Sequence, residues 1–303
     1  MSTPNFFIIG APKAGTTALA HYLSEHEKVF FSNIKEPFFW CDDFNKNRHE
    51  FNIHSIEKYL DLFNEATEDI IAIGEGSTRY LRSKSAVKNI VKFNPKARFI
   101  IMLRNPIESV LAFHMEQMYS LEENVEDFER AWKLQDKRKS GLCLPPKCSN
   151  PELLQYGDAY KYAGQLEHVY SNVSPDKVKV IIFDDFKTDT LNVYKDTLSF
   201  LGLDYDGREK FPALNSAHKH RFKFLARLIL SPPKILAPYI LMIRLWLIKK
   251  RFPVVEAVKS SLNIRAPRKK ISKELELELK EYFKSDILRL SKILGRDLSH
   301  WVD

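Results

Sequence analysis

The sequence is poor in cysteine. Its 303 residues include three, Cys41, Cys143 and Cys148. An odd number at low density excludes a disulfide scaffold, and thiols this far apart do not make a zinc site. Cys143 and Cys148 flank two prolines in a predicted loop and could pair, but we expect free thiols in a reducing cytoplasm. His-Glu-x-x-His and calcium-loop patterns are also absent from the sequence, so we expect no metal.

Long apolar runs are missing as well. In the most apolar stretch, 224–252, the longest uncharged run is Ile235–Ile243, with nine residues, whereas spanning a bilayer takes about 20. Its periodicity favours a buried helix pair; contact with a membrane surface, or a cover over an apolar ligand, are the alternatives. The first apolar run, Phe6–Ile9, leads into a glycine-containing loop and is typical of a strand rather than a signal peptide. We therefore expect a cytoplasmic protein, with peripheral membrane contact through 224–252 as an open alternative.

The charge balance is basic, with a net charge of +8. This suits an anionic ligand or serves solubility alone. The basic residues are not interleaved with aromatic ones in a single stripe, so we expect no nucleic-acid partner. Hydrophobic residues make up 44% of the chain, enough for a large core, and we find no repeat.

Strand and helix patterns alternate along most of the chain. Short apolar runs predict strands, and apolar residues at helical spacing predict helices between them, which together indicate an α/β fold with a parallel sheet covered on both sides. Ligands bind such sheets at the carboxyl ends of the strands, so the loops after Ile9, Phe31 and Leu103 are the expected site. The predicted strands are Phe6–Ile9, Val29–Phe31, Ile70–Ile73, Phe99–Leu103 and Val178–Phe183. The predicted helices are 83–93, one from Pro106, 128–133, 160–170, 191–201 and a final one that carries Leu275, Leu279, Tyr282, Ile287, Leu290 and Leu294 on its face and stops at Gly295.

The chain is predicted to be one domain, 1–303. It carries a polar and largely irregular insertion at about 119–157, which we expect at an acceptor site, and the apolar segment at about 224–252.

The first strand is followed by a loop with the spacing of a phosphate-binding loop. It has glycine, four residues, glycine and then hydroxyl residues, from Gly10 through Lys13 and Gly15 to Thr16 and Thr17. Small residues let backbone N–H groups close around an anion at a helix N-terminus. A nucleoside-triphosphate loop places lysine directly after the second glycine, where this sequence has Thr16. A small-molecule kinase on the same fold is the second hypothesis, and the absence of this lysine argues against it.

These motifs resemble those of sulfotransferases that use 3′-phosphoadenosine 5′-phosphosulfate (PAPS), with a three-layer P-loop-type fold. Pro-Lys-Ala-Gly-Thr-Thr after the first strand is similar to the family's 5′-phosphosulfate loop, and Phe99–Ser109 to its 3′-phosphate segment. Weaker similarities follow in the expected order at 178–185 and 197–203, and the segment 294–301 is similar to the C-terminal signature of bacterial members.

The resemblance implies PAPS as the donor, the bisphosphate PAP as its product, and no metal. Arg104 is the implied 3′-phosphate ligand. The family has a serine eight residues later, where this chain has Ala112, and Ser109 on the same helix face could replace it. A late basic loop offers Lys219 or Arg221 as a further phosphate contact or as a solvated turn. The implied loop ligands of the 5′-phosphosulfate are Lys13, Ala14, Gly15, Thr16, Thr17 and Ala18.

Sulfuryl transfer needs a base for the acceptor's proton and a cation for the charge that builds on the leaving phosphate. Glu36 is the predicted base, because it follows the second strand and precedes paired aromatics, as in heparan-sulfate-type sulfotransferases. Lys13 is the predicted cation. His114 is the other base candidate, or a packing or acceptor-site residue. Glu75 is expected after the third strand, and acceptor contacts are expected from Lys35, Phe38, Glu75 and His114.

The acceptor is a hydroxyl or amine of a carbohydrate, a lipid or a small natural product. Basic residues in the insertion favour an anionic or polar acceptor, whereas 224–252 favours an apolar one. A membrane-surface binding protein without catalytic activity is the non-enzymatic alternative, and it leaves the phosphate loop and Glu36 without a role. The basic residues in question are Lys133, Lys137, Arg138 and Lys139.

Overall fold

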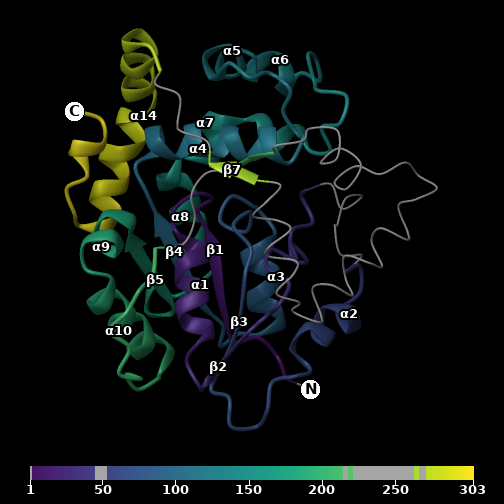
Figure 1. Ribbon diagram of the computed structural model, residues 1–303, viewed down its shortest axis with the longest axis vertical. Coiled ribbons are helices and arrows are strands. Elements are labelled where there is room, and N and C mark those ends of the chain that lie inside the picture. The colour runs from purple at the N-terminus through teal and green to yellow at the C-terminus, as the bar shows by residue number, and fades with distance from the viewer. Residues whose placement is uncertain (1, 45–52, 214–217, 221–262, 266–270) are drawn as a thin grey trace.

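A five-stranded parallel sheet forms the centre of the protein. The computed structural model describes residues 2–44, 53–213, 218–220, 263–265 and 271–303. The strand order is β2-β3-β1-β4-β5, and helices cover both faces, which confirms the predicted α/β fold class (Figure 1). The strands are β1 (Phe6–Gly10), β2 (Val29–Phe31), β3 (Ala72–Gly76), β4 (Arg98–Leu103) and β5 (Val178–Ile182), and a separate antiparallel pair joins β6 (His218–His220) to β7 (Asn263–Arg265).

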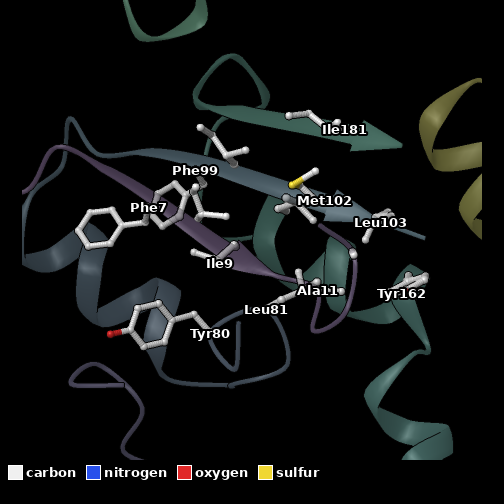
Figure 2. Close-up of a cluster of buried hydrophobic side chains, with 14 of the residues drawn as sticks. Phe7, Ile9, Ala11, Tyr80, Leu81, Phe99, Met102, Leu103, Tyr162 and Ile181 are labelled. Carbon is white, nitrogen blue, oxygen red and sulfur yellow. The ribbon is translucent and has the colours of Figure 1, made fainter. Parts of the chain in front are cut away.

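The two central strands are apolar because both of their faces are covered. All five residues of β1 are buried, and Phe7 stacks on Phe99 of β4 with ring centroids 5.9 Å apart. Figure 2 shows this cluster continuing from Ile9 to Met102 on the neighbouring strand. Continuous burial explains why these segments read as unbroken apolar runs rather than as an alternating pattern.

The third strand differs from its prediction. It starts two residues later than Ile70 and runs through Gly76, so that Glu75 lies within the strand. The reason is the space beside β1 and β2. A side chain at Gly74 would come within 2.2 Å of the Phe6 ring, and one at Gly76 within 3.2 Å of Phe31. A side chain would collide with Phe6 at Gly74 and would be tight against Phe31 at Gly76, so small residues continue the strand where the apolar pattern ends.

The helices follow the predicted order. In the last helix, Ser272 caps the first turn by accepting a hydrogen bond from the Leu275 amide, and Gly295 ends the helix in the left-handed conformation, with φ 60°, as predicted. Phe283 rather than Tyr282 is fully buried on its inner face. The α-helices are α1 (Thr16–Ser24), α2 (Ile56–Leu60), α3 (Ala86–Phe93), α4 (Pro106–Tyr119), α5 (Phe128–Lys133), α6 (Gln135–Lys139), α7 (Tyr156–Ala159), α8 (Tyr162–Tyr170), α9 (Phe183–Thr188), α10 (Thr190–Leu201) and α14 (Lys273–Leu294). The 3₁₀ helices are η2 (Asp61–Phe63), η3 (Pro151–Leu154), η4 (Pro175–Lys177) and η5 (Ser299–Trp301).

The 119–157 insertion is more ordered than predicted. It contains α5, α6 and η3 besides the start of α7, near the top of Figure 1. Its centre is a fully buried ion pair in which Arg138 donates to both carboxylate oxygens of Glu123, at 2.6 and 2.8 Å. The Tyr156 hydroxyl donates to the same carboxylate at 2.6 Å. Arg138 was predicted to favour an anionic acceptor; its guanidinium is instead enclosed in the insertion, because the Glu123 charge would otherwise be buried alone.

Arg138→Ala is expected to lower the free energy of unfolding by about 3–5 kcal/mol, because it leaves Glu123 buried without its counter-charge. Urea unfolding at neutral pH measures the change. Lys139→Ala is the matched control, since its ammonium is 69% exposed and 3.7 Å from Asp158, and the expected change is within about 0.5 kcal/mol. Equal losses in the two variants would contradict the structural role of the buried pair.

No helix in the described part of the chain is both long and apolar enough to cross a membrane. The 224–252 segment, with its proposed helix pair or membrane contact, lies outside the described residues, as does Arg221.

Candidate active site

Loops from four strands meet at the carboxyl edge of the sheet. The Glu36 amide, in the loop after β2, donates to the Gly76 carbonyl at the end of β3, at 2.9 Å. The Arg104 guanidinium, after β4, donates to the Lys13 carbonyl in the loop after β1, at 3.4 Å. The sequence-predicted residues Lys13, Glu36 and Arg104 are therefore brought to one edge, as the strand order requires.

The loop after β1 leads directly into the start of α1. Ala11 and Ala14 are fully buried, Lys13 has a positive φ of 62°, and Gly15 caps α1 with φ 92°. No side chain caps α1, and no acidic residue lies in its first turn. Backbone N–H groups and the dipole at such a helix start favour an anion.

Two lysine side chains lie beside this helix start. Lys35 Nζ donates to Thr17 Oγ1 at 2.5 Å and is 4.0 Å from Glu36 Oε1. Lys13 Nζ lies 3.4 Å from Glu116 Oε1 on α4, in a pair whose side chains are 36% and 43% exposed. An exposed pair of this kind is weak, so the Lys13 ammonium can turn to a stronger anionic partner.

Glu36 has a left-handed backbone conformation, and its side chain is held by a hydrogen bond. It has a positive φ of 64°, and its Oε1 accepts a hydrogen bond from Thr78 Oγ1 at 2.9 Å. Its side chain is 32% exposed. A carboxylate that is fixed by one hydroxyl and still reaches solvent can accept a proton from a bound molecule.

Arg104 and Ser109 form the second polar group of the site. The Arg104 guanidinium bonds to Glu108 and lies over the Phe183 ring, 4.4 Å from its centroid. Ser109 is fully buried, and its Oγ makes no hydrogen bond of normal geometry within the described residues, although the Tyr162 hydroxyl lies beside it. A guanidinium and a hydroxyl are both donors that suit a phosphate, which supplies several strong acceptors.

The remaining predicted residues lie around this centre in different ways. Phe38 has a positive φ of 51°, and the Arg79 guanidinium is 4.0 Å from the centroid of its ring. His114 is buried, and its Nε2 is 2.8 Å from the Val125 carbonyl, so this nitrogen is used in packing the insertion. Burial lowers the pKa of His114 below its usual value. Lys219 belongs to β6, and its side chain lies outside the described residues.

Glu75 is fully buried and accepts hydrogen bonds from three hydroxyl groups instead of facing solvent. Thr17 and Thr16 begin α1, with Thr16 buried, and Ala18 is buried one residue further.

Two residues near the site were missed by sequence reasoning. Thr78 fixes the Glu36 carboxylate, and Glu116 contacts Lys13. A hydroxyl two residues beyond β3 was a usable signal for Thr78, since it lies at the expected edge. Glu116 lies 103 positions from Lys13, and no local pattern joins them. Within the described ranges, no three metal-binding side chains form a cluster.

Known proteins resemble this chain in sequence and in fold. A family model described as "Sulfotransferase family" matches residues 4–207. Human carbohydrate sulfotransferase 15 is 28% identical over 235 residues, which are 63% of this chain and 38% of that protein. Mouse bifunctional heparan sulfate N-deacetylase/N-sulfotransferase 4 is 33% identical over 119 residues, 38% of this chain and 13% of that protein. The chain thus spans well under half the length of these curated relatives.

A solved sulfotransferase from Alicyclobacillus acidocaldarius has the same fold, with a TM-score of 0.72, 23% identity and full coverage of both chains. The family match covers two thirds of the sequence and contains the phosphate loop, Glu36 and Arg104. The chain belongs to the sulfotransferase family.

Proposed function

We propose that the protein transfers a sulfuryl group from PAPS to a hydroxyl or amine of a carbohydrate acceptor. One observation carries the proposal. Lys35 Nζ bonds to Thr17 in the first turn of α1 and lies 4.0 Å from the Glu36 carboxylate, so an acid–base group stands next to an anion-binding helix start. The names of the relatives, which include a carbohydrate and a heparan sulfate sulfotransferase, support a glycan over the lipid and natural-product acceptors.

The described residues fit a donor with two phosphate-bearing ends. The uncapped start of α1, with Ala14, Gly15, Thr16, Thr17 and Ala18, would hold the 5′-phosphosulfate. Arg104 and the unsatisfied Ser109 hydroxyl would hold the 3′-phosphate, with Ser109 taking the role of the serine that is absent at Ala112. Arg104 then exchanges part of its contact with Glu108 for the phosphate. Lys219 and Arg221 stay candidates for a further contact.

The transfer step assigns one task to each of two side chains. PAPS supplies a sulfuryl group on a good leaving phosphate. Glu36 accepts the proton of the acceptor hydroxyl or amine as the new bond to sulfur forms. Lys13 donates a hydrogen bond to the phosphate oxygen that takes up charge as the old sulfur–oxygen bond breaks. The 119–157 insertion and Phe38 border the acceptor side within a single catalytic domain.

Arg104→Ala is expected to weaken PAP binding by about 10- to 100-fold, the loss of a bidentate charged contact. The kcat at saturating donor should change less than the affinity, because Arg104 binds away from the reacting atoms. Calorimetric titration with PAP and steady-state kinetics measure the two effects. A lower kcat with unchanged PAP affinity would indicate that Arg104 acts in the chemical step and not in donor binding.

Radiolabelled PAPS with a panel of acceptors tests the function as a whole. We expect label in oligosaccharides with free hydroxyl or amine groups, and less in phenols and lipids. Transfer of phosphate from ATP in the presence of magnesium, without any sulfuryl transfer, would support the kinase, which family membership disfavours. Labelled lipids without labelled oligosaccharides would overturn the glycan proposal alone.

A further inference from the structure

A carboxyl group that the proposed mechanism does not use lies beneath the loop that carries Glu36. Glu75 is 0% exposed. Its Oε1 accepts hydrogen bonds from the Tyr80 hydroxyl at 2.8 Å and from the Tyr59 hydroxyl at 3.1 Å. Its Oε2 accepts one from Ser77 Oγ at 2.8 Å. Three donors around one buried carboxylate compensate its desolvation, which is the usual condition for burying such a group.

Two of these three hydroxyls also hold the loop after β2. The Phe38 amide donates to Ser77 Oγ at 3.2 Å, and the Trp40 amide donates to the Tyr80 hydroxyl oxygen at 3.4 Å. Ser77 and Tyr80 therefore connect Glu75 to the backbone of the segment that begins with Lys35 and Glu36.

The third hydroxyl belongs to a ring that packs on the same loop. Tyr59 stacks on Phe39 with centroids 4.7 Å apart and meets Trp40 edge-on at 5.2 Å. The Glu75 carboxylate is thus in contact, through one shell of hydroxyl groups, with consecutive residues of the loop from Phe38 to Trp40.

The direction of these hydrogen bonds depends on the Glu75 charge. A hydroxyl has one proton to donate. Ser77 and Tyr80 each accept a hydrogen bond from a backbone amide and donate their own hydrogen bond to Glu75. An ionised carboxylate only accepts, so it keeps both hydroxyls turned in this sense. A protonated carboxyl, or a glutamine amide, carries a donor of its own and faces groups that already donate.

The loop needs such support because its backbone is strained. Glu36 and Phe38 have positive φ values of 64° and 51°. A non-glycine residue in this left-handed region is strained, and such a conformation persists only where the surroundings fix it. Three hydrogen bonds from backbone amides fix the conformation here. The Glu36 amide donates to the Gly76 carbonyl, the Phe38 amide to Ser77 Oγ and the Trp40 amide to the Tyr80 hydroxyl.

We propose that Glu75 is a positioning residue whose ionised carboxylate orients the Ser77 and Tyr80 hydroxyls, fixes the strained 36–40 loop and so sets the place of the Glu36 carboxylate for proton transfer. This role rests on the proposed function of Glu36. It replaces the acceptor contact expected of Glu75 from the sequence.

The same geometry makes the reaction sensitive to pH. Burial raises the pKa of Glu75 to about 7, although the hydrogen bonds from Tyr80, Ser77 and Tyr59 oppose the shift. Cys41 and the two tyrosines also face this carboxylate, and burial raises the pKa of each, so they stay protonated near neutral pH. The charge of Glu36 adds repulsion, which also raises the pKa of Glu75. Because protonated Glu75 can no longer accept from all three hydroxyls, kcat should rise as the pH increases through about 7.

Kinetics of Glu75→Gln over pH 5.5–9 test the proposal, with Ser77→Ala as the second variant because it removes the bond to Phe38 and leaves the carboxylate. We expect kcat to fall by about 10- to 100-fold in both variants, with PAP affinity within about twofold of wild type. The rise of kcat near pH 7 should disappear in Glu75→Gln. Glu36→Gln should lower kcat by a smaller factor in the Glu75→Gln background than in the wild-type protein, because both residues act on the same step.

Three results would overturn the role of Glu75. The first is that Glu75→Gln keeps the kcat and pH dependence of the wild-type protein while Glu36→Gln is inactive. In that case Glu36 is still the base, but Glu75 does not position it. The second is a raised KM for the acceptor with unchanged kcat, which would indicate acceptor contact instead. The third is full activity of Glu36→Gln, which would remove the base and with it the role that depends on it.

Discussion

Glu36→Gln is expected to lower kcat by about 10²- to 10⁴-fold, the range in which a positioned general base contributes. Glutamine keeps the length of the side chain and can accept the hydrogen bond from Thr78 Oγ1, so the loop keeps its support. It cannot take the proton of the acceptor. The loss should therefore appear in the chemical step, with the KM for PAPS and the affinity for PAP nearly unchanged.

The matched control for this variant is Glu27→Gln, which changes an exposed glutamate outside the site. We expect wild-type kinetics there. Full activity of Glu36→Gln, with a folded protein by circular dichroism, would show that another group removes the proton. An equal loss in both variants would point to a general effect of the substitution rather than to the base.

Lys13→Ala is the second variant with a large expected effect, a fall in kcat of about 10²- to 10³-fold. The ammonium lies in the loop at the start of α1, where the structure leaves it a weak partner in Glu116. In the transition state it stabilises charge on the leaving phosphate, which is larger there than in the bound donor. The affinity for PAPS, in which this charge has not yet developed, should fall much less than kcat falls, by about 10-fold or less.

An exposed lysine supplies the control for Lys13. Lys96 lies in the turn before β4, away from the carboxyl edge of the sheet, and Lys96→Ala should leave kcat unchanged. Glu116→Gln tests whether the pairing of Lys13 with Glu116 matters for catalysis. It removes the competing partner and should keep turnover. A loss of PAPS binding in Lys13→Ala as large as the loss of kcat would contradict a role specific to the transition state.

The fold and the edge that carries the site were predictable from local patterns. Buried parallel strands read as apolar runs, as in Phe6–Ile9 and Phe99–Leu103, and a loop of small residues followed the first of them. Once the strands were known to be parallel, the loops after Ile9, Phe31 and Leu103 had to meet at one edge. This is why Lys13, Glu36 and Arg104 could be named before their geometry was known.

Other features depended on contacts that no local pattern encodes. β3 continues through Gly74 and Gly76 because the rings of Phe6 and Phe31 fill the space beside it, and these rings lie far away in the sequence. The same shift of the strand buried Glu75, which as a loop residue would have faced the site. Arg138 appeared to be a surface charge until Glu123, 15 positions away, proved to be its buried partner.

The position of Ser109, which we expect to replace the family serine absent at Ala112, was predicted only in part. The helical spacing placed Ser109 on the same face as Ala112. The Ser109 hydroxyl is buried and has no hydrogen bond of normal geometry to any residue that the structure describes. The Tyr162 hydroxyl, which lies beside Ser109, donates to the Arg104 carbonyl at 3.0 Å, and no local pattern in the sequence predicts this contact.

Calorimetric titration of the protein with PAP, beside ATP with and without magnesium, tests the central claim most directly. We expect metal-independent PAP binding that Arg104→Ala weakens, and ATP binding weaker by at least about tenfold. Tight binding of ATP with magnesium and no heat from PAP would contradict the assignment of the loop after β1 and of Arg104 to a sulfuryl donor.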